Sequence, residues 1–336
     1  MLQYIVRRLL LMVPTLIGMT LIVFMMARFA PGLTGGGQFG EGGGRNAREN
    51  RELARVNLLK KLGMMDADGK ELPLYYQYWR WLKGAATFQF GESVKYGEPV
   101  SKLIGNALPV TLTMNVIATL VVYGLALPGG MLAAVKRGKW FDEIWSFVTL
   151  ALFSLPVIWI GNLAIFELAY SKNLAWFPAG NLHSADTRGF TWLQYSTDYL
   201  WHLVLPIAVS CLGGFAYLSK LMRASMISNM YEDYARTARA KGVSQFYVVV
   251  RHVLRNSLLP MITVFALVIP GLLGGSLVIE YIFNIPGMGQ LGVTAAQSRD
   301  LPVLQALTFI GSLLSLICLL LADICYAIAD PRVSYE

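Results

Sequence analysis

Residues 103–135 read LIGNALPVTLTMNVIATLVVYGLALPGGMLAAV, a run of 33 residues without a charged side chain. A helix needs about 20 apolar residues to cross the hydrocarbon core of a bilayer, so this run is long enough to span one. Helices of soluble proteins average about 11–12 residues, which makes a buried soluble helix a poor alternative. The run therefore predicts a membrane-spanning helix.

Five more charge-free runs predict further spans, and they cover residues 9–27, 144–166, 203–219, 256–279 and 301–322. The composition agrees, because 55% of the 336 residues are hydrophobic and 14% are charged. A soluble domain carries roughly 25% charged residues. We predict an all-α membrane protein with six transmembrane helices.

The basic residues predict the orientation of these spans. With a cytoplasmic N-terminus, the short cytoplasmic segments hold 13 Lys and Arg residues and the two short external loops hold three. Because Lys and Arg collect on the cytoplasmic side, both termini are expected there. This placement accounts for the net charge of +8, which does not indicate binding of nucleic acid.

We divide the chain into residues 1–30 with the first span, an external segment 31–102, and a core 103–336 with the other five spans. The external segment begins with GLTGGGQFGEGGGRN at 32–46, which is typical of a flexible linker. It continues to LPLYYQYWRWLKG at 72–84, which is rich in aromatic residues. After the fifth span, EYIFNIPGMGQLG at 280–292 predicts tight turns.

No catalytic residue is predicted. The chain has no H-E-x-x-H, G-x-S-x-G or C-x-x-C pattern, which disfavours a membrane-embedded enzyme, and its three cysteines suggest no metal or redox centre. The spans lack the buried charges of a self-powered transporter, although Glu167, Glu280 and Asp323 at helix ends leave that class open. Neutral polar residues could line a substrate pathway or bond a neighbouring helix, and these are Thr111, Thr113, Asn115, Ser154 and Asn162.

A short polar helix is predicted between the fourth and fifth spans, where residues 233–242 read DYARTARAKG. Asn229 and Glu232 suggest its start and Gly242 its end, giving a helix over 230–241. Its face of small residues around Ala235 and Ala238 would let the backbone of a partner protein approach closely. The alternative is a basic helix on lipid headgroups, but such helices usually carry large apolar residues.

RTARAKG at 236–242, followed by LRNSLLP at 254–260, resembles the cytoplasmic signature of binding-protein-dependent ABC importer permeases. The general signature has Glu where this chain has Arg236, and R-T-A-R-A-K-G is common in the dipeptide, oligopeptide and nickel branch. The resemblance extends to YIVRRLLLMVPTLIGMT, QYWRWLKG, FGESV, VKRGKWFD, IFNIPGMGQLG and YAIADPR. The insert at 32–46 and the segments 199–206 and 213–216 most resemble permeases of the microcin C and oligopeptide type.

The resemblance implies the type I ABC importer permease fold and a role in moving peptides across the bacterial inner membrane. The alternative cargo is a nickel chelate or another small solute. The expected partners are membrane lipid, a homologous second permease, an external substrate-binding protein and two ATPase subunits. ATP and Mg would bind those ATPase subunits, so this chain is not expected to be an enzyme or to hold a cofactor.

The resemblance also implies roles for particular residues. The helix at 230–241 would be the coupling helix that docks on the ATPase, with Ala238 at the closest approach. Its expected contact residues are Tyr234, Ala235, Arg236, Thr237, Ala238, Arg239, Ala240, Lys241 and Gly242. Separately, the concentration of aromatic and turn residues in 72–84 and 286–290 predicts an external gate that also contacts the binding protein. It is expected to include Trp79, Trp81, Pro286, Gly287, Met288 and Gly289.

Overall fold

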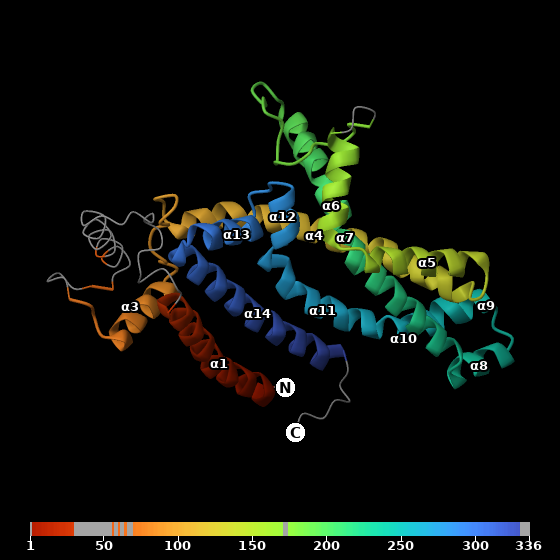
Figure 1. Ribbon diagram of the computed structural model, residues 1–336. Helices are drawn as coiled ribbons and strands as arrows, with labels where there is room; N and C mark the ends of the chain where they lie inside the picture. Colours follow the sequence, from red (N-terminus) through yellow and green to blue (C-terminus); the bar gives the residue numbers. More distant parts are fainter. Residues whose placement is uncertain are drawn as a thin grey trace. The chain divides into compact units, whose positions relative to one another are not determined.

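The computed structural model describes residues 2–29, 56, 60, 64–65, 70–170 and 174–329 (Figure 1). The glycine-rich segment 32–46, for which a linker was predicted, lies outside these residues. Within the described ranges the regular structure is helical, apart from the isolated bridges Met65–Glu71 and Glu92–Pro99. The expectation of an all-α protein is confirmed.

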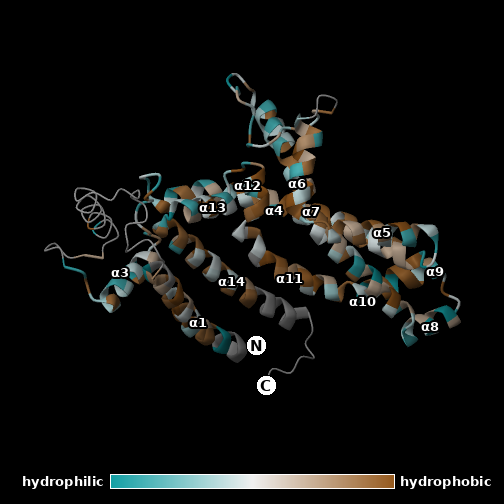
Figure 2. Ribbon diagram, viewed as in Figure 1, coloured by the Kyte–Doolittle hydropathy of each residue, from teal (hydrophilic) through white to brown (hydrophobic). Residues whose placement is uncertain are grey.

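Five stretches of helix are long and apolar enough to cross a membrane, namely Arg7–Met25, Val100–Val135, Trp192–Met230, Gln245–Ile269 and Leu301–Leu320. They belong to α1 (Leu2–Phe29), α4 (Val100–Val135), α7 (Trp192–Met230), a composite segment, and α14 (Leu301–Ala329). The composite segment consists of α9 (Gln245–Tyr247), the π-helix η2 (Val248–Val253), α10 (Leu254–Ser257) and α11 (Leu259–Gly274). Figure 2 shows the apolar residues concentrated on these helices.

The remaining predicted span, at 144–166, is bent. The pair Trp140–Ser154 and Val157–Tyr170 turns by 94° between α5 (Trp140–Ser154) and α6 (Val157–Ile165), which continues into the π-helix η1 (Phe166–Tyr170). Pro156 supplies the physical reason, because a proline pushes the preceding residue out of the helical region. Leu155 accordingly has φ −84° and ψ 132°. An uninterrupted helix over 144–166 was therefore a wrong expectation, and the six spans are obtained only if the bent pair counts as one.

The chain forms two compact units, residues 1–108 with 291–336 and residues 109–290, called unit 1 and unit 2 below. In unit 1, α1 packs along α14 and contacts α3 (Leu74–Ala86). The contact is aromatic, because Phe24 of α1 lies 5.5 Å from Tyr78 and 6.1 Å from Trp81, both of α3 (centroid distances). Trp81 in turn lies 6.1 Å from Phe309 of α14. This cluster holds the three helices together.

Unit 2 is built around α7, which packs against α5, α6 and α11. Gly130 permits a close crossing of α4 and α7, since a Cβ atom there would lie 2.5 Å from the carbonyl oxygen of Ser219. A buried apolar cluster in this unit contains residues of five elements, α4, α7, α8, η2 and α11. Its members are Ala126, Ala134, Leu218, Met222, Met226, Ala235, Ala238, Val248, Val249, Val253 and Met261.

A buried ion pair fixes the start of α5 to α7. Asp142 is 4% exposed and accepts hydrogen bonds from Arg223 Nη2 at 2.7 Å, from Arg223 Nε, and from the Gly138 amide at 3.0 Å. Bidentate pairing of this kind is stronger and more directional than a single contact. The turn at 136–139 and two helices thus depend on one carboxylate.

We expect Asp142→Asn to destabilise the fold. Breaking a buried pair costs about 3–5 kcal/mol, and the low end applies because 29% of the Arg223 side chain is exposed. Thermal denaturation of the purified protein should show a clear drop in Tm. Asp233→Asn is the control, since Asp233 is 98% exposed and lies 3.8 Å from Arg236. An equal drop in both variants would contradict the assignment.

Candidate functional site

The short polar helix predicted from the sequence is present as α8 (Asp233–Ala240). It ends as expected, because Gly242 has φ +81° and the amides of Gly242 and Val243 bond back to the carbonyls of Arg239 and Ala238. Its predicted start was wrong. Asn229 lies inside α7, where its Oδ1 accepts a hydrogen bond from Tyr234 Oη at 2.6 Å, and α8 begins only after Glu232.

The small-residue face of α8 packs on its own chain. Ala235 is fully buried and Ala238 is 8% exposed, and both belong to the apolar cluster that contains Val248, Val249 and Val253 of η2. The alanines are small because the helix lies tightly against this cluster. The expectation that Ala238 faces a partner protein at the closest approach does not agree with this position.

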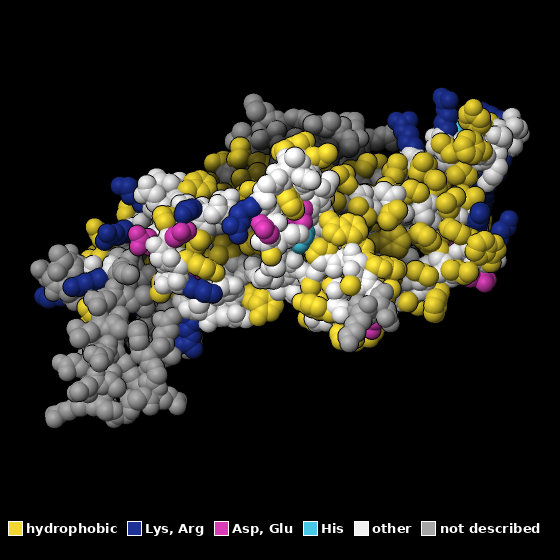
Figure 3. Space-filling model, turned by 90° about the horizontal axis from the view of Figure 1, so that it is seen from above, with side chains coloured by type: hydrophobic (Ala, Val, Ile, Leu, Met, Phe, Trp, Pro, Cys, Tyr) yellow, Lys and Arg dark blue, Asp and Glu magenta, His cyan; other side chains and the backbone are white. Residues whose placement is uncertain are grey.

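The opposite face of α8 is open. Asp233, Arg236, Thr237, Ala240 and Lys241 are exposed, whereas Tyr234 and Arg239 are half-buried. Beyond the helix, Phe246 is 71% exposed and Tyr247 is 59% exposed. Figure 3 shows Lys and Arg side chains grouped at the end of unit 2 that carries α8. A charged surface with two exposed aromatic rings is suited to contact with a protein partner.

Arg239 connects α8 to the elements on both sides. Its Nη2 donates to the carbonyl of Met230, the last residue of α7, at 3.1 Å, and its Nε donates to Gln245 Oε1 in α9 at 3.2 Å. Together with the Tyr234–Asn229 bond, these contacts attach α8 to α7 and α9. The helix is thus hydrogen-bonded to segments of two candidate spans, Trp192–Met230 and Gln245–Ile269.

A cavity of about 580 Å³ lies within unit 2 among α4, α7 and α11. Its polar lining includes Asn115, Thr119, Tyr123, Ser210 and Ser276. The Asn115 amide crosses from α4 to α11, donating to the carbonyl of Leu272 at 2.9 Å. Among the described residues, no three His, Cys, Asp or Glu side chains lie close enough to hold a metal ion.

Only Asn115 of the five expected pathway residues lines this cavity. The hydroxyls of Thr113 and Ser154 and the amide of Asn162 instead bond the carbonyl four residues back in their own helix, at 2.8, 2.8 and 3.0 Å. Thr111 is fully buried and bonds to Glu280. The expected pathway set is thus not brought together at one place.

Glu280 was noted in the sequence only as a charge at a helix end, and it proves to be the centre of a buried network. It lies in α12 (Leu277–Ile282) with no exposed surface. Its carboxylate accepts hydrogen bonds from Thr111 Oγ1 at 2.9 Å and from the amides of Gly289, Gln290 and Ser276 at 2.6, 3.1 and 3.2 Å. Thr111 Oγ1 also accepts a bond from the Met288 amide at 2.8 Å.

The PGMG turn is therefore folded around one carboxylate. A Cβ atom at Gly287 would lie 2.4 Å from Glu280 Oε2, and one at Gly289 would lie 2.8 Å from the Leu277 nitrogen, so both positions require glycine. Burial raises the pKa of Glu280, and the hydrogen bonds from Gln290, Thr111, Gly289 and Ser276 oppose that rise. Since all four partners donate, the network is built for the ionised form.

The residues expected at the external gate fall into two groups. Trp79 is 65% exposed on α3, and Pro286 is also exposed. Trp81 lies in the aromatic cluster of unit 1, while Gly287, Met288 and Gly289 are buried around Glu280 in unit 2. Two of the six residues expected to contact a partner therefore have exposed side chains.

We expect Glu280→Gln to loosen the PGMG turn. In either amide orientation an NH₂ group would face backbone N–H donors, which leaves buried donors unpaired at a cost of about 1–3 kcal/mol. Hydrogen–deuterium exchange should become faster at the amides of Gly289 and Gln290. Glu143→Gln is the control because Glu143 is exposed. Unchanged exchange at both amides in Glu280→Gln would refute the role of the carboxylate.

Comparison with known proteins places this arrangement in a family. The family described as binding-protein-dependent transport system inner membrane component matches residues 126–335. The oligopeptide transport system permease protein AppB of Bacillus subtilis (strain 168) is 37% identical over 339 residues, covering 100% of both chains. The inner membrane ABC transporter permease protein YejB of Escherichia coli O157:H7 is 32% identical, with 99% of both chains covered. A putative peptide transport system permease protein of Brucella abortus (strain 2308) is 34% identical, also over 99% of both.

A chain of the MetNI methionine ABC transporter, solved in inward-facing conformations, has a similar fold. The TM-score is 0.50 at 15% sequence identity, and the match covers 68% of the present chain and 96% of the MetNI chain. At this identity the likeness shows the fold alone, which is that of a type I ABC importer permease. From the family match and the full-length relatives, the chain belongs to the binding-protein-dependent transport system inner membrane components.

Proposed function

We propose that this chain is the permease subunit of an ATP-binding-cassette importer that carries peptides across the bacterial inner membrane. The observation that carries the proposal is the match to an oligopeptide permease along the full length of both chains. The inner-membrane family and the five or six apolar spans support a multi-pass location. Peptide is preferred to a nickel chelate or another small solute because the relatives whose names state a cargo are named for peptides.

The energy for transport would come from partner subunits. The chain contains no G-x-x-x-x-G-K-[ST] phosphate-binding sequence, so ATP and Mg belong on two separate ATPase subunits. A homologous second permease would complete the pathway, and an external substrate-binding protein would deliver the peptide. The cavity lined by Asn115 and Ser210 is the part of that pathway supplied by unit 2.

In this proposal α8 is the coupling helix, and its open face is the ATPase contact. Arg236, Thr237, Ala240 and Lys241 would touch the ATPase, since their side chains are exposed. Ala235, Ala238 and Arg239 would transmit the movement, because they attach the helix to η2 and α7. The residues expected to contact the ATPase are thus divided: those on the exposed face would make the contact, and those on the buried face would attach the helix to its own chain.

The external side would be contacted by the binding protein at Trp79 and Pro286, whose side chains are exposed. Glu280 would hold the turn that contains Pro286 in its folded conformation.

Both termini would be cytoplasmic, as the distribution of Lys and Arg suggests. Cysteines introduced at Ala86 and Ala240 should then react with an impermeant maleimide from opposite sides of the membrane, and reaction from one side would refute this orientation.

Arg236→Glu should weaken the ATPase contact without lowering stability. Loss of an exposed ion pair costs about 1 kcal/mol or less, so co-purification of the ATPase should fall by up to roughly fivefold. Uptake of a labelled peptide, in cells that express the full complex, should fall in parallel. Arg188→Glu reverses another exposed charge, at a side chain that is 96% exposed, and should change neither.

Ala238→Leu should act differently, lowering the Tm of this chain because overpacking a core costs about 1–3 kcal/mol. If Arg236→Glu retains full ATPase association and uptake, α8 is not the contact. If the full complex accumulates a nickel chelate and no peptide, the proposed cargo is wrong.

Trp79→Ala should reduce the stimulation of ATP hydrolysis by the binding protein and leave the Tm unchanged, since Trp79 is 65% exposed. Trp81→Ala is the matched comparison on the same helix. It removes a ring from the aromatic cluster and should lower the Tm, because large-to-small changes of a packed aromatic ring cost about 3–5 kcal/mol. Normal stimulation in Trp79→Ala would exclude this residue from the contact.

A further inference from the structure

A cavity of about 230 Å³ lies within unit 1, where two candidate spans end. Phe24 in its wall belongs to the span Arg7–Met25, and Pro302 and Gln305 belong to the span Leu301–Leu320. Each of these residues lies within a few positions of the end of its span. The cavity is therefore at the level where the hydrocarbon core of a bilayer meets the lipid headgroups.

The floor of the cavity is aromatic. Phe24 and Phe90 are 2% and 8% exposed, and Trp81 lies beside Phe24 in the aromatic cluster. Phe90 also packs on Phe309, with ring centroids 5.9 Å apart. This floor is part of the aromatic contact that joins α1, α3 and α14.

One buried amide in the wall has a polar atom without a partner, and a second amide lies beside the same cavity. Gln77 is 4% exposed, and its Nε2 donates to the Leu72 carbonyl at 2.7 Å, but its Oε1 is buried and unbonded. Gln305 is 7% exposed, and its side chain makes no hydrogen bond to another described residue. Buried polar groups are nearly always bonded, so the free Oε1 of Gln77 on this cavity indicates a polar ligand.

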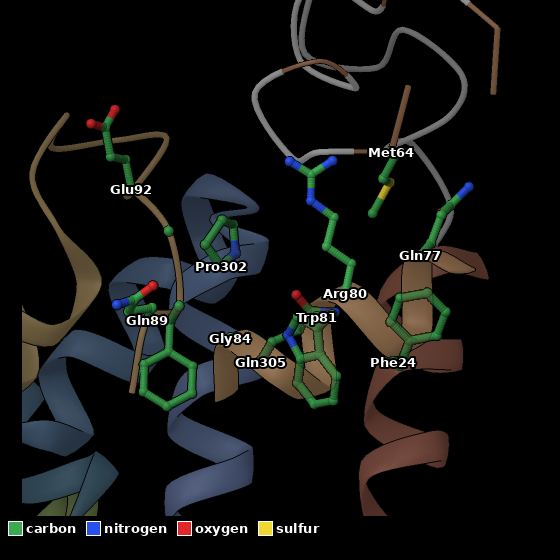
Figure 4. A pocket seen from close by; sticks show the side chains of 12 residues that line it. Phe24, Met64, Gln77, Arg80, Trp81, Gly84, Gln89, Glu92, Pro302 and Gln305 are labelled. Atoms are coloured by element: carbon green, nitrogen blue, oxygen red, sulfur yellow. The ribbon is translucent and has the colours of Figure 1, made fainter. Parts of the chain in front are cut away.

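The rim carries one charge of each sign. Figure 4 shows the Arg80 guanidinium extending from α3 and the Glu92 carboxylate extending from the segment after it, both away from the aromatic floor. Neither side chain has an ion pair or a hydrogen bond among the described residues. A cation and an anion that are both unpaired, on different walls of one cavity, suit a ligand that is itself zwitterionic.

We infer that this cavity binds the headgroup of a zwitterionic phospholipid with a primary ammonium, such as phosphatidylethanolamine. Arg80 binds the phosphate, since guanidinium matches phosphate oxygens in bidentate geometry. Glu92 accepts hydrogen bonds from the ammonium, while Gln77 lies on the other side of Arg80 (Figure 4). Gln305 completes the polar contacts at the start of α14, and the acyl chains remain in the bilayer beside α1 and α14.

The size and depth of the cavity favour a lipid over other zwitterions. The cavity is smaller than the roughly 300–1,000 Å³ of a site that encloses a whole ligand, but it exceeds the space of a single water. A headgroup fills such a site while the rest of the molecule stays outside. A zwitterionic peptide has the same charges but no apolar part to hold it at the ends of two spans.

The test uses the complex purified in detergent and native mass spectrometry of retained lipid. Phosphatidylethanolamine, phosphatidylglycerol and phosphatidylcholine are added singly and in competition. Arg80→Gln should weaken retention of both phosphatidylethanolamine and phosphatidylglycerol by about fivefold, as loss of one exposed ion pair predicts. Glu92→Gln should weaken phosphatidylethanolamine alone and so remove its advantage over phosphatidylglycerol.

Lys83→Gln is the matched control, because Lys83 is exposed on the same helix and does not line the cavity. It should retain phosphatidylethanolamine like the unchanged protein. Arg80 and Glu92 are exposed and take no part in packing, so all variants should share one Tm, which is measured alongside. The inference fails if the Arg80 and Glu92 variants retain as much phosphatidylethanolamine as the control, if phosphatidylglycerol binds more tightly, or if a zwitterionic dipeptide displaces the lipid.

Discussion

A bilayer offers no water to the polar groups of a protein backbone, and the structure depends on this constraint. Each candidate span satisfies its amides and carbonyls within a helix, and short polar side chains follow the same rule. The hydroxyls of Thr113 and Ser154 and the amide of Asn162 bond carbonyls of their own helix. The helix breaks where a local cause is present, as at Pro156, and the chain then turns by 94°.

The same constraint explains how the buried acids are placed. Removing a charge from water costs several kcal/mol unless partners replace the water, so Asp142 and Glu280 are each surrounded by donors. The donors come from distant parts of the chain: Arg223 for Asp142, and Thr111 for Glu280. Each acid therefore fixes a turn to a helix, which ordinary hydrophobic contact would leave free to slide.

In the proposed function, coupling would depend on a difference between the two faces of α8. The inner face is apolar and small, which lets the helix lie on η2, and Arg239 bonds the elements before and after it. The outer face is polar and exposed, as a surface for a separate subunit must be. Because its buried face is attached to the chain and its outer face can contact another subunit, α8 could transmit a movement of that subunit to α7 without lying in a span.

The sequence by itself determined the class of fold, five of the six predicted spans and the end of α8 at Gly242. Charge-free runs of about 20 residues have one stable solution in a membrane, and a glycine after RTARAK has one common use, so local chemistry was sufficient. Only the tertiary structure decided which face of α8 is buried. Alanine fits both a partner's surface and a core, and the choice depends on Val248 and Val249 lying opposite. The role of Glu280 could not be predicted from the sequence either. Its carboxylate is bonded by Thr111, 169 positions away, and by backbone amides, which no sequence pattern identifies.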